Sequence, residues 1–414
     1  MQADMQRLRL LASHFAAAGW EIEVLCPDAS YQREYALEPS AERFFPQVPV
    51  HEVGPWAPAF FRLLRAETIG WRALVPIGRK GSELLRTGRF DLVYFSTTAH
   101  LLTCWGPHWR AKHGVPYVAD VHDPVHQPRR QYSTSRRRLK SLIAAKLAAR
   151  IEKRALGSAD GLASVSPGYI EDLAARYPVA RWRRDGCVLV QPFPADTAGL
   201  EVVSGQARGG AAKRIVYVGA GGTIMQKGWQ ALLAAWKSAK GTNALRIELY
   251  GTSGDWRPGE KGFLETLALS AGVETVREQP GRIPYAQALE RTKGADGLLV
   301  LGVDDPNYRP SKLHTYLATG LPVIVTVHCD SPLTEWLEQA GPGIHVIRFG
   351  GDAKAQAHAN VRALRMFFDD VLNAKRVKSS DRQVLTAWQA AAEHARFFDI
   401  VTSSAPADFQ RAVD

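Results

Sequence analysis

The segment GLLVLGVDDPNYRPSKLHTYLATGLPVIV, residues 297–325, carries the clearest fold signal of the chain. It opens with the apolar run 298–303, which is typical of a strand buried on both faces of a parallel sheet. After a polar loop, Pro310 or Ser311 begins a helix, since serine is a good N-cap and proline is tolerated in the first turn. Gly320 ends the helix, and a second apolar strand follows. This order predicts an α/β fold with the loop at the carboxyl edge of the sheet, where such sheets bind ligands.

Two basic residues mark the start of this helix. Lys312 lies in the first turn, and Arg309 comes shortly before it. A helix N-terminus carries unpaired N–H groups and a partial positive charge, so the two side chains predict a seat for a phosphate group. By composition alone the alternative, in which both are ordinary solvated charges, is favoured, because many helices begin with a basic residue.

The motif PSKLxxYLAxGxPV at residues 310–323 resembles the donor site of GT-B glycosyltransferases, most closely that of glycosyltransferase family 4. The resemblance is specific over this motif and extends more weakly over nearly the whole chain. It implies that the helix presents groups to the ribose and diphosphate of a nucleotide-sugar linked to UDP or GDP. It also implies transfer of the sugar with retention, without a metal ion or a cofactor.

The chain departs from the family pattern at two positions. The family usually carries two glutamates eight residues apart, and Asn307 and Thr315 stand in their places here. Either side chain can hydrogen-bond a hydroxyl group, but neither brings a carboxylate. Donor binding is therefore better supported than catalysis. Together with Arg309, Ser311 and Lys312, these two residues complete the donor site expected in this segment.

A second phosphate-binding element is expected after the strand 214–218. The turn that follows contains Gly221 and Gly222, and the absence of a Cβ lets backbone N–H groups approach a phosphate. Lys227 resembles the family's diphosphate-binding lysine, whereas the family's arginine just after the first glycine is absent and Ala220 occupies that region. A glycine-rich turn alone is weak evidence, but together with the later motif it favours phosphate binding.

Polar side chains follow several predicted strands in the first half of the chain. His122 and Asp123 follow the strand 117–121, and His122 resembles the histidine near the transferred sugar in the family, so this pair is the catalytic candidate. A buried, satisfied His–Asp pair is the alternative. His100 follows another strand and is a second candidate for the acceptor cleft. Ser166 either lines the same cleft or caps the next helix, and capping is the better-supported interpretation.

Length and composition fit a two-domain globular protein. The 414 residues include 46% hydrophobic and 22% charged residues, which are ordinary values. The four cysteines are far apart and make no metal-ligand spacing, which fits a reducing compartment. No stretch is long enough for a transmembrane helix and no signal peptide is visible, so a cytoplasmic location is expected.

The net charge of +11 is concentrated in residues 129–154, which include ten basic residues and one acidic residue. This segment has three interpretations: a solvated helix face, an interfacial helix on an anionic membrane, or a nucleic-acid site. Only one aromatic residue, Tyr132, is near the basic ones, so nucleic acid ranks last. Membrane proximity is narrowly favoured, because lipid-linked acceptors are common in the family that the chain resembles.

The alternation of strands and helices starts twice along the chain. A first domain is expected over residues 1–195, a linker over 196–213 and a second domain over 214–380. The last segment, 381–414, is expected to cross back to the first domain as a helix. The resemblance implies two Rossmann-like domains in a GT-B arrangement with an interdomain cleft. The donor is expected on the second domain, and a glycan or lipid-linked acceptor on the first.

The beginning of the first domain is unusual. The helix pattern at 5–18 precedes the strand 21–26, whereas a Rossmann-like domain begins with a strand and a glycine-rich turn. We therefore expect the missing strand to be encoded upstream, and we expect this shorter chain to be poorly active.

Sequence analysis thus predicts a glycosyltransferase of polysaccharide or glycolipid assembly, with two rivals. A non-catalytic subunit that binds a nucleotide-sugar fits the two absent glutamates, and a nucleotide-sugar epimerase shares the expected fold. The fold does not separate these functions. Hydrolysis of a donor in the absence of an acceptor would distinguish a transferase from a binding subunit.

Overall fold

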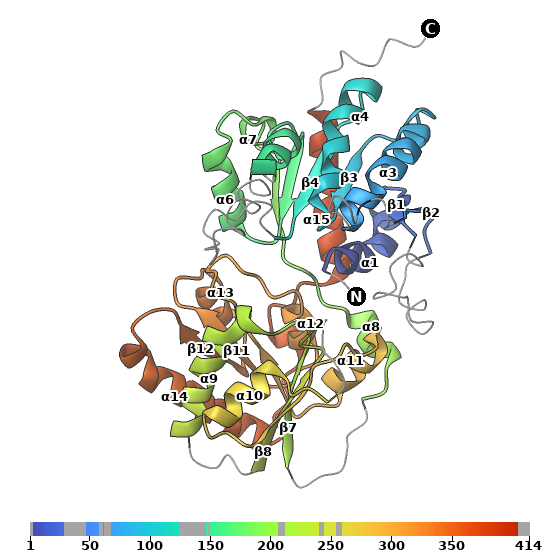
Figure 1. The fold of residues 1–414 in the computed structure, drawn as a ribbon. Helices are drawn as coiled ribbons and strands as arrows, with labels where there is room; N and C mark the ends of the chain where they lie inside the picture. Colours follow the sequence, from blue (N-terminus) through green and yellow to red (C-terminus); the bar gives the residue numbers. More distant parts are fainter. Residues whose placement is uncertain are drawn as a thin grey trace. The chain divides into compact units, whose positions relative to one another are not determined.

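The computed structural model describes residues 3–28, 47–57, 61, 68–123, 146–147, 149–205, 212–239, 244–253 and 259–404. These residues form two compact α/β units (Figure 1). Unit 1 contains the described residues up to Pro192 together with those from Trp388 onwards. Unit 2 contains the described residues between Phe193 and Ala387.

Unit 2 is built on a six-stranded parallel sheet in the order β12-β11-β10-β7-β8-β9. Its strands are β7 (Lys213–Val218), β8 (Leu245–Tyr250), β9 (Val276–Gln279), β10 (Gly297–Val300), β11 (Val323–His328) and β12 (Ile344–Phe349). Its longer helices are α9 (Gln226–Ser238), α10 (Phe263–Ser270), α11 (Tyr285–Lys293), α12 (Leu313–Ala318), α13 (Leu333–Gln339) and α14 (Ala353–Leu372). The order runs outward from β7 to β9 and restarts at β10 on the other side of β7. Unit 2 is therefore a doubly wound, Rossmann-like sheet whose strand order reverses between β7 and β10.

The strands of unit 2 bury side chains on both faces. Ile215 and Tyr217 of β7 join one hydrophobic cluster with α9, α10 and α14, and Val216 joins another with α12 and α13. Helices cover both faces, which is why these strands are nearly continuous apolar runs. The two cores hold the strands in place, so the loops at their carboxyl ends have a rigid base.

Unit 1 contains a four-stranded parallel sheet in the order β3-β4-β5-β6 and a separate parallel pair, β1-β2. Its strands are β1 (Val24–Pro27), β2 (Val50–Val53), β3 (Val93–Ser96), β4 (Tyr117–Val121), β5 (Gly161–Ser164) and β6 (Val188–Val190). Its helices include α1 (Ala3–Phe15), α3 (Ile69–Leu85), α4 (Trp105–His113), α6 (Pro167–Arg176) and α7 (Arg181–Arg184). Strand β4 is buried along its whole length and has the bounds that its sequence predicts.

The last helix, α15 (Ala387–Ser403), belongs to unit 1 although it follows unit 2 in the sequence. The ring of Phe398 lies 5.7 Å from that of Phe15, 5.3 Å from that of Trp20 and 5.2 Å from that of Tyr94, measured between centroids. These aromatic contacts join α15 to α1, to the segment after it and to β3.

The central helix begins later than its sequence predicts. We expected it to start at Pro310 or Ser311, but α12 starts at Leu313, and Lys312 holds the N-cap position. The reason is a preceding turn, in which the Leu313 N–H donates to the Pro310 carbonyl at 3.2 Å. Its end agrees with the prediction, because Gly320 takes the left-handed φ of +72°.

The segment expected as a linker is in part an ordered piece of unit 2. Asp196 caps the short helix α8 (Thr197–Val202), and its Oδ1 accepts from the Gly199 N–H at 2.9 Å. Leu200 and Val203 are buried against α11. The glycines of this segment predict a linker. Its first residues are nevertheless ordered, because apolar side chains pack on unit 2 and the Asp196 carboxylate caps a helix.

The basic segment 129–154 lies largely outside the described residues, which resume at 146. Within the described ranges, no helix combines the length and the apolar character that crossing a bilayer requires.

Candidate functional site

The carboxyl ends of β7 and β10 are neighbours at the reversal of strand order in unit 2, which is where open α/β sheets bind ligands. The turn after β7 is rich in glycine. Gly219 and Gly222 have φ angles of +132° and +91°, a region that favours glycine. The Gly221 N–H donates to the Thr252 carbonyl at 2.9 Å, and a Cβ on Gly221 would lie 3.0 Å from the Thr252 side chain. This turn therefore requires glycine for its conformation and its close contacts.

Lys312 reaches this turn from the other side of the reversal point. Its Nζ lies 4.0 Å from the centroid of the Tyr217 ring, a cation–π contact. A Cβ on Gly219 would lie 2.3 Å from the same Nζ, so the glycine leaves the room that the ammonium occupies. Burial lowers the pKa of Lys312 to about 7. Within the described part of the chain Lys312 makes no ion pair, so the site holds a cation without an anionic partner.

Lys227, in the first turn of α9, also lies at this edge of the sheet. Its Nζ is 2.6 Å from Asp304 Oδ2, in the loop after β10, and both side chains are substantially exposed. His328 Nε2, at the end of β11, lies 3.8 Å from Asp304 Oδ1. Lys227 and Lys312 are thus brought to the carboxyl ends of neighbouring strands, one paired with a carboxylate and one without.

The residues at the two positions that lack the expected glutamates make different hydrogen bonds. Thr315 Oγ1 accepts a hydrogen bond from the Asp196 N–H at 3.0 Å, so this hydroxyl anchors the start of α8. The Asn307 N–H donates to Asp305 Oδ1 at 2.9 Å, which shapes the loop after β10. No local pattern indicated that position 315 supports α8, because the two hydrogen-bonded residues are 119 positions apart.

The remaining donor-site candidates lie in the loop before α12. Arg309 Nη1 donates to the Tyr308 carbonyl at 3.3 Å and to Ser331 Oγ at 3.2 Å. Ser311 is partly exposed in the turn before the helix. A pocket beside this loop is lined by residues from the ends of β10 and β11, among them Asp305, Tyr308, Thr326, His328 and Ser331.

In unit 1 a buried ionic cluster lies at the carboxyl end of β4. Asp120 Oδ2 is 2.8 Å from Arg7 Nε, 2.6 Å from His122 Nε2 and 2.5 Å from the Tyr94 hydroxyl. Less than a tenth of Asp120, His122 and Arg7 is exposed. Desolvation opposes the charge on Asp120, but Arg7 and His122 outweigh it and hold the pKa of the carboxyl well below its usual range. The cluster therefore contains a carboxylate, not a carboxylic acid.

The two catalytic candidates at this strand end have different environments. The side chain of His122 is 1% exposed, and its Nε2 contacts Asp120, which is the buried His–Asp contact considered above, made to the aspartate two residues earlier. Asp123, the next residue, is exposed. Residues two apart share one side of a strand, so His122 follows Asp120 inward.

Sequence reasoning missed Arg7. This side chain is 1% exposed, and besides Asp120 it reaches the Gln191 carbonyl at 2.8 Å, after β6. A signal was present, because Arg7 precedes Leu11 and Phe15 at intervals of four residues and shares their buried helix face. An arginine on an apolar face needs a buried carboxylate, which here is 113 positions away along the chain.

His100 and Ser166 also lie at the carboxyl edge of this sheet. His100 begins the 3-10 helix His100–Cys104 after β3. Ser166 stands at the N-cap of α6, as predicted, but its side chain makes no capping hydrogen bond. Its Oγ is buried and has no hydrogen-bond partner among the described residues. Ser166 is held instead through its N–H, which donates to Ser164 Oγ at 3.3 Å.

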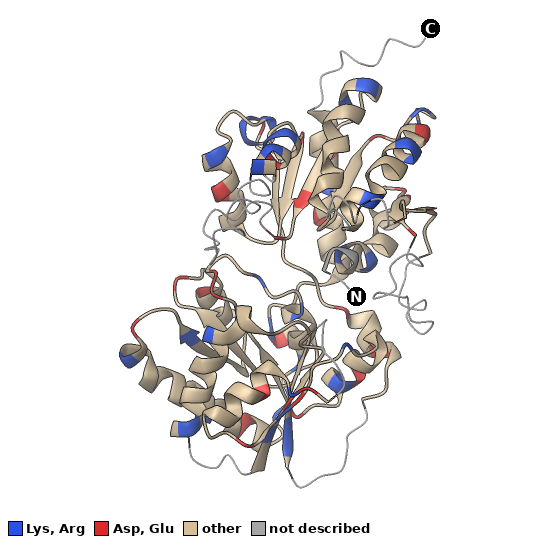
Figure 2. Cartoon of the chain, viewed as in Figure 1, with Lys and Arg blue, Asp and Glu red and all other residues tan. Residues whose placement is uncertain are grey.

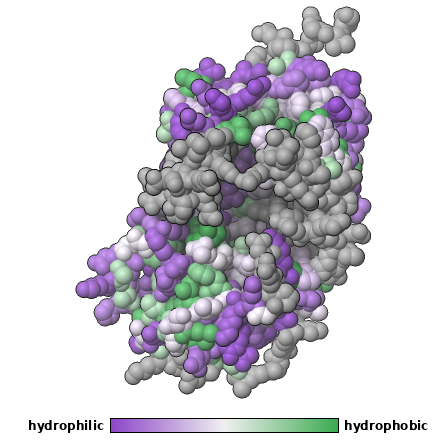
Figure 3. Space-filling model, in the orientation of Figure 1, coloured by the Kyte–Doolittle hydropathy of each residue, from purple (hydrophilic) through white to green (hydrophobic). Residues whose placement is uncertain are grey.

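Lysine and arginine residues gather around α6 and α7 of unit 1 (Figure 2). The exposed ones in the described helical residues 146–154 and in α7 are Lys146, Arg150, Lys153, Arg154, Arg183 and Arg184. Trp182 Nε1 donates to the Leu156 carbonyl at 2.7 Å, which fixes α7 against the end of that helix. Much of the visible surface of unit 1 is accordingly hydrophilic (Figure 3).

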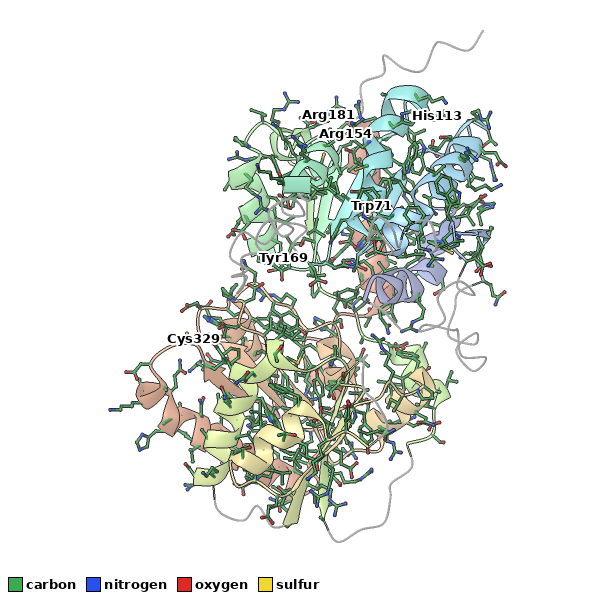
Figure 4. The ribbon with its side chains drawn as sticks, in the orientation of Figure 1. Trp71, His113, Arg154, Tyr169, Arg181 and Cys329 are labelled. Carbon is green, nitrogen blue, oxygen red and sulfur yellow. The ribbon has the colours of Figure 1, made fainter. Side chains whose placement is uncertain are left out.

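This basic surface lies at the amino ends of the strands. Arg181 Nη1 is 2.7 Å from Asp160 Oδ1, and Asp160 immediately precedes β5. In Figure 4, Arg154 and Arg181 lie at one end of unit 1, and Tyr169, near the start of α6, lies towards the other. The basic surface and the Asp120 cluster are therefore at opposite edges of the sheet.

One group of metal-ligand residue types is found among the described residues. The possible ligand atoms of His328, Cys329 and Asp330 lie within 4.8 Å of one another (Cys329 is labelled in Figure 4). His328 Nδ1 accepts from the Asp330 N–H at 3.2 Å, and its Nε2 lies 3.8 Å from Asp304. Both nitrogens are thus engaged by the protein itself. All four cysteines are free.

The comparisons with known proteins agree with this architecture. Residues 6–185 match the model of the glycosyl transferase 4-like domain. No curated protein matches the sequence. Among solved structures, HepE of Anabaena is 14% identical with a TM-score of 0.57, over 94% of this chain and 95% of that one.

Two further solved structures have similar scores. Sucrose-phosphate synthase of Thermosynechococcus elongatus is 17% identical with a TM-score of 0.57, over 96% of this chain and 93% of that one. WaaG, a glycosyltransferase of lipopolysaccharide biosynthesis, is 16% identical with a TM-score of 0.51, over 97% of this chain and 94% of that one. At these identities the likeness shows the fold alone. The chain has the fold of these GT-B proteins, and its residues 6–185 match the model of the glycosyl transferase 4-like domain.

Proposed function

We propose that the protein transfers a sugar from a UDP- or GDP-linked donor to a glycan or lipid-linked acceptor, with retention, the donor binding to unit 2 and the acceptor to unit 1. Lys312 is the observation that carries the donor assignment. Its ammonium stacks on Tyr217 beside the glycine-rich turn and makes no ion pair among the described residues. A diphosphate supplies the missing anion, and the glycines of the turn let it approach the backbone closely. The complex of HepE with UDP-glucose supports this class of donor.

The roles of the other donor-site residues are assigned from their positions around Lys312. Lys227 and Arg309 add positive charge at the same edge, where they stabilise the charge that develops on the leaving diphosphate. Gly221 and Gly222 form the turn, and Asn307, Ser311 and Thr315 hydrogen-bond hydroxyl or phosphate oxygens of the donor. Lys227 forms an ion pair with Asp304 until the donor binds.

On unit 1 the acceptor site is assigned to the carboxyl edge of β3, β4 and β5. The buried His122 and the exposed Asp123 stand at the end of β4, His100 follows β3, and Ser166 is at the N-cap of α6. These are polar groups on a rigid parallel sheet, the arrangement from which α/β enzymes build their sites.

The basic surface of unit 1 supports peripheral attachment to an anionic membrane. Six exposed lysines and arginines lie on the helical residues 146–154 and on α7, and Val179 beside α7 is 80% exposed. Each basic residue near such a membrane contributes about 1 kcal/mol, which salt screens.

Vesicle binding tests the attachment. The change Arg183→Gln/Arg184→Gln is expected to weaken binding to phosphatidylserine vesicles by roughly tenfold or more, since it removes two such contributions. Lys237→Gln/Arg246→Gln in unit 2 alters the charge equally and is the control. Binding that is insensitive to lipid charge and to ionic strength would exclude the attachment.

A non-catalytic subunit that binds nucleotide-sugars is the second candidate, and one observation favours it. Thr315 replaces a glutamate, and its hydroxyl already anchors the start of α8 through Asp196. In that case unit 2 binds the donor and no sugar is transferred.

Calorimetry with UDP, GDP and their sugars, combined with a donor-hydrolysis assay, separates the two candidates. Lys312→Ala is expected to weaken nucleotide binding by roughly 1.5–3 kcal/mol, the range for a hydrogen bond to a charged group. Lys237→Ala, an exposed lysine of α9, is the matched control. Turnover supports the transferase, and tight binding without turnover supports the subunit. Equal affinities of Lys312→Ala and the wild type would contradict the donor site.

A further inference from the structure

The carboxylate of Asp120 organises the end of β4. One of its oxygens, Oδ2, forms an ion pair with Arg7 of α1, accepts from the hydroxyl of Tyr94 of β3 and contacts His122 after β4. Arg7 Nε donates to His122 Nε2 at 3.3 Å. The cluster extends to two more elements. Arg7 Nη2 donates to the carbonyl of Gln191 after β6 at 2.8 Å, and the Tyr94 hydroxyl lies 3.3 Å from His394 Nε2 of α15. A buried charge pair with this many fixed partners allows one arrangement of the strand end.

Two buried partners hold the His122 ring. Its Nε2 lies 2.6 Å from Asp120 Oδ2 and accepts from Arg7 Nε at 3.3 Å. The nitrogen that a histidine most often presents to a substrate is therefore committed inside the protein. With 1% of its side chain exposed, His122 belongs to the cluster.

Asp123 is the next residue, and it is exposed at the same edge of the sheet. Its carboxylate is an acceptor for hydroxyl hydrogen bonds and a source of negative charge. Neither Asn307 nor Thr315 brings a carboxylate to the donor motif.

We propose that the two residues divide their roles: His122 is a positioning residue, held by Asp120 and Arg7, and Asp123 is the group that contacts the hydroxyl groups of the sugar substrate. This division rests on the proposed function. The cluster fixes the end of β4, and Asp123, which is exposed, follows it directly in the chain.

Paired variants test the division of roles in the full chain. Asp123→Asn is expected to lower kcat by at least 100-fold while the thermal midpoint changes little, because the side chain is exposed. Asp172→Asn, an exposed carboxylate on α6, is the control for a change of charge alone. His122→Leu is expected to lower both the midpoint and the activity. His122→Gln, whose amide N–H can still donate to Asp120, is expected to recover at least tenfold of the activity lost in His122→Leu.

Nitrogen NMR of histidine-labelled protein gives a readout that does not depend on turnover. In the wild type, the signal that disappears in His122→Gln should show one fixed protonation pattern at the two ring nitrogens, because both Asp120 and Arg7 hold Nε2. A ring that exchanges between tautomers, or a His122→Gln variant as inactive as His122→Leu with a wild-type midpoint, would overturn the positioning role. Full activity of Asp123→Asn would overturn the contact with substrate. A wild type that turns over no donor refutes the proposed function and the role of Asp123 with it, whereas the NMR result still decides whether Asp120 holds His122.

Discussion

Lys312 couples donor binding to pH. Burial lowers its pKa from 10.5 to about 7, so above pH 7 the folded protein carries this amine largely uncharged. A diphosphate stabilises the charged form, so binding takes up a proton once the pH exceeds 7. We expect the affinity for UDP or GDP to fall as the pH rises from 7 to 8.5. Calorimetry in two buffers with different heats of ionisation measures the proton uptake, which Lys312→Ala should abolish.

Gly219 provides a second test at the scale of one residue. A Cβ here would lie 2.3 Å from Lys312 Nζ, so Gly219→Ala should displace the ammonium and reduce nucleotide affinity about as much as Lys312→Ala does. The φ of +132° also adds backbone strain of about 1–3 kcal/mol. Gly272→Ala is the matched control, since Gly272 has a φ of +75° and no atom within 4 Å of the added Cβ. If both variants lose affinity equally, the contact with Lys312 is not the cause.

Single residues of the site were predictable where one local motif carried them. Lys312, Arg309 and Gly221 come from two short stretches whose composition indicates phosphate binding. The Asp120 cluster was not predictable as a whole, because its members come from α1, β3, β4 and α15. Only the tertiary fold brings together side chains that are more than a hundred positions apart.

At the scale of elements, α15 stabilises unit 1 through its aromatic face. Phe398 is 3% exposed and packs on the rings of Phe15, Trp20 and Tyr94. Phe398→Ala is expected to reduce the free energy of unfolding of unit 1 by about 3–5 kcal/mol, the range for deleting a buried phenyl ring. Ile400→Ala, at a position that is 54% exposed, should change it by less than about 0.5 kcal/mol. Hydrogen exchange, resolved by peptide, measures the effect in α1 and β3. Equal protection in the two variants would contradict the prediction.

Elements were predictable where burial on both faces produced an apolar run. The bounds of β4 agree with its sequence pattern, and Gly320 ends α12 as expected. Predictions failed where a local hydrogen bond changed the geometry. The turn from Pro310 delays α12, and the capping carboxylate of Asp196 forms α8 in a glycine-containing segment.

At the scale of the whole molecule, buried histidines make both units sensitive to mild acid. Burial lowers the pKa of His314 in unit 2 to about 4 and that of His394 in unit 1 to about 3, from 6.5. Below pH 6.5 the unfolded chain binds protons that the folded chain does not, so the free energy of unfolding falls as the pH falls. Each group contributes about 1.4 kcal/mol per pH unit, because one pKa unit corresponds to that energy.

The two histidines therefore give separable effects between pH 6.5 and 5. His394→Gln is expected to flatten the pH dependence of unit 1 while that of unit 2 remains, because His314 and its hydrogen bond from the Leu385 N–H are unchanged. His314→Gln should do the converse. Hydrogen exchange of core amides in each unit, measured across this pH range, follows the two stabilities in one sample. Because both histidines destabilise their units as the pH falls, the free energy of unfolding of the two units should decrease together in the wild type. A wild type whose stability is flat from pH 6.5 to 5 would show that these rings are protonated in the folded state.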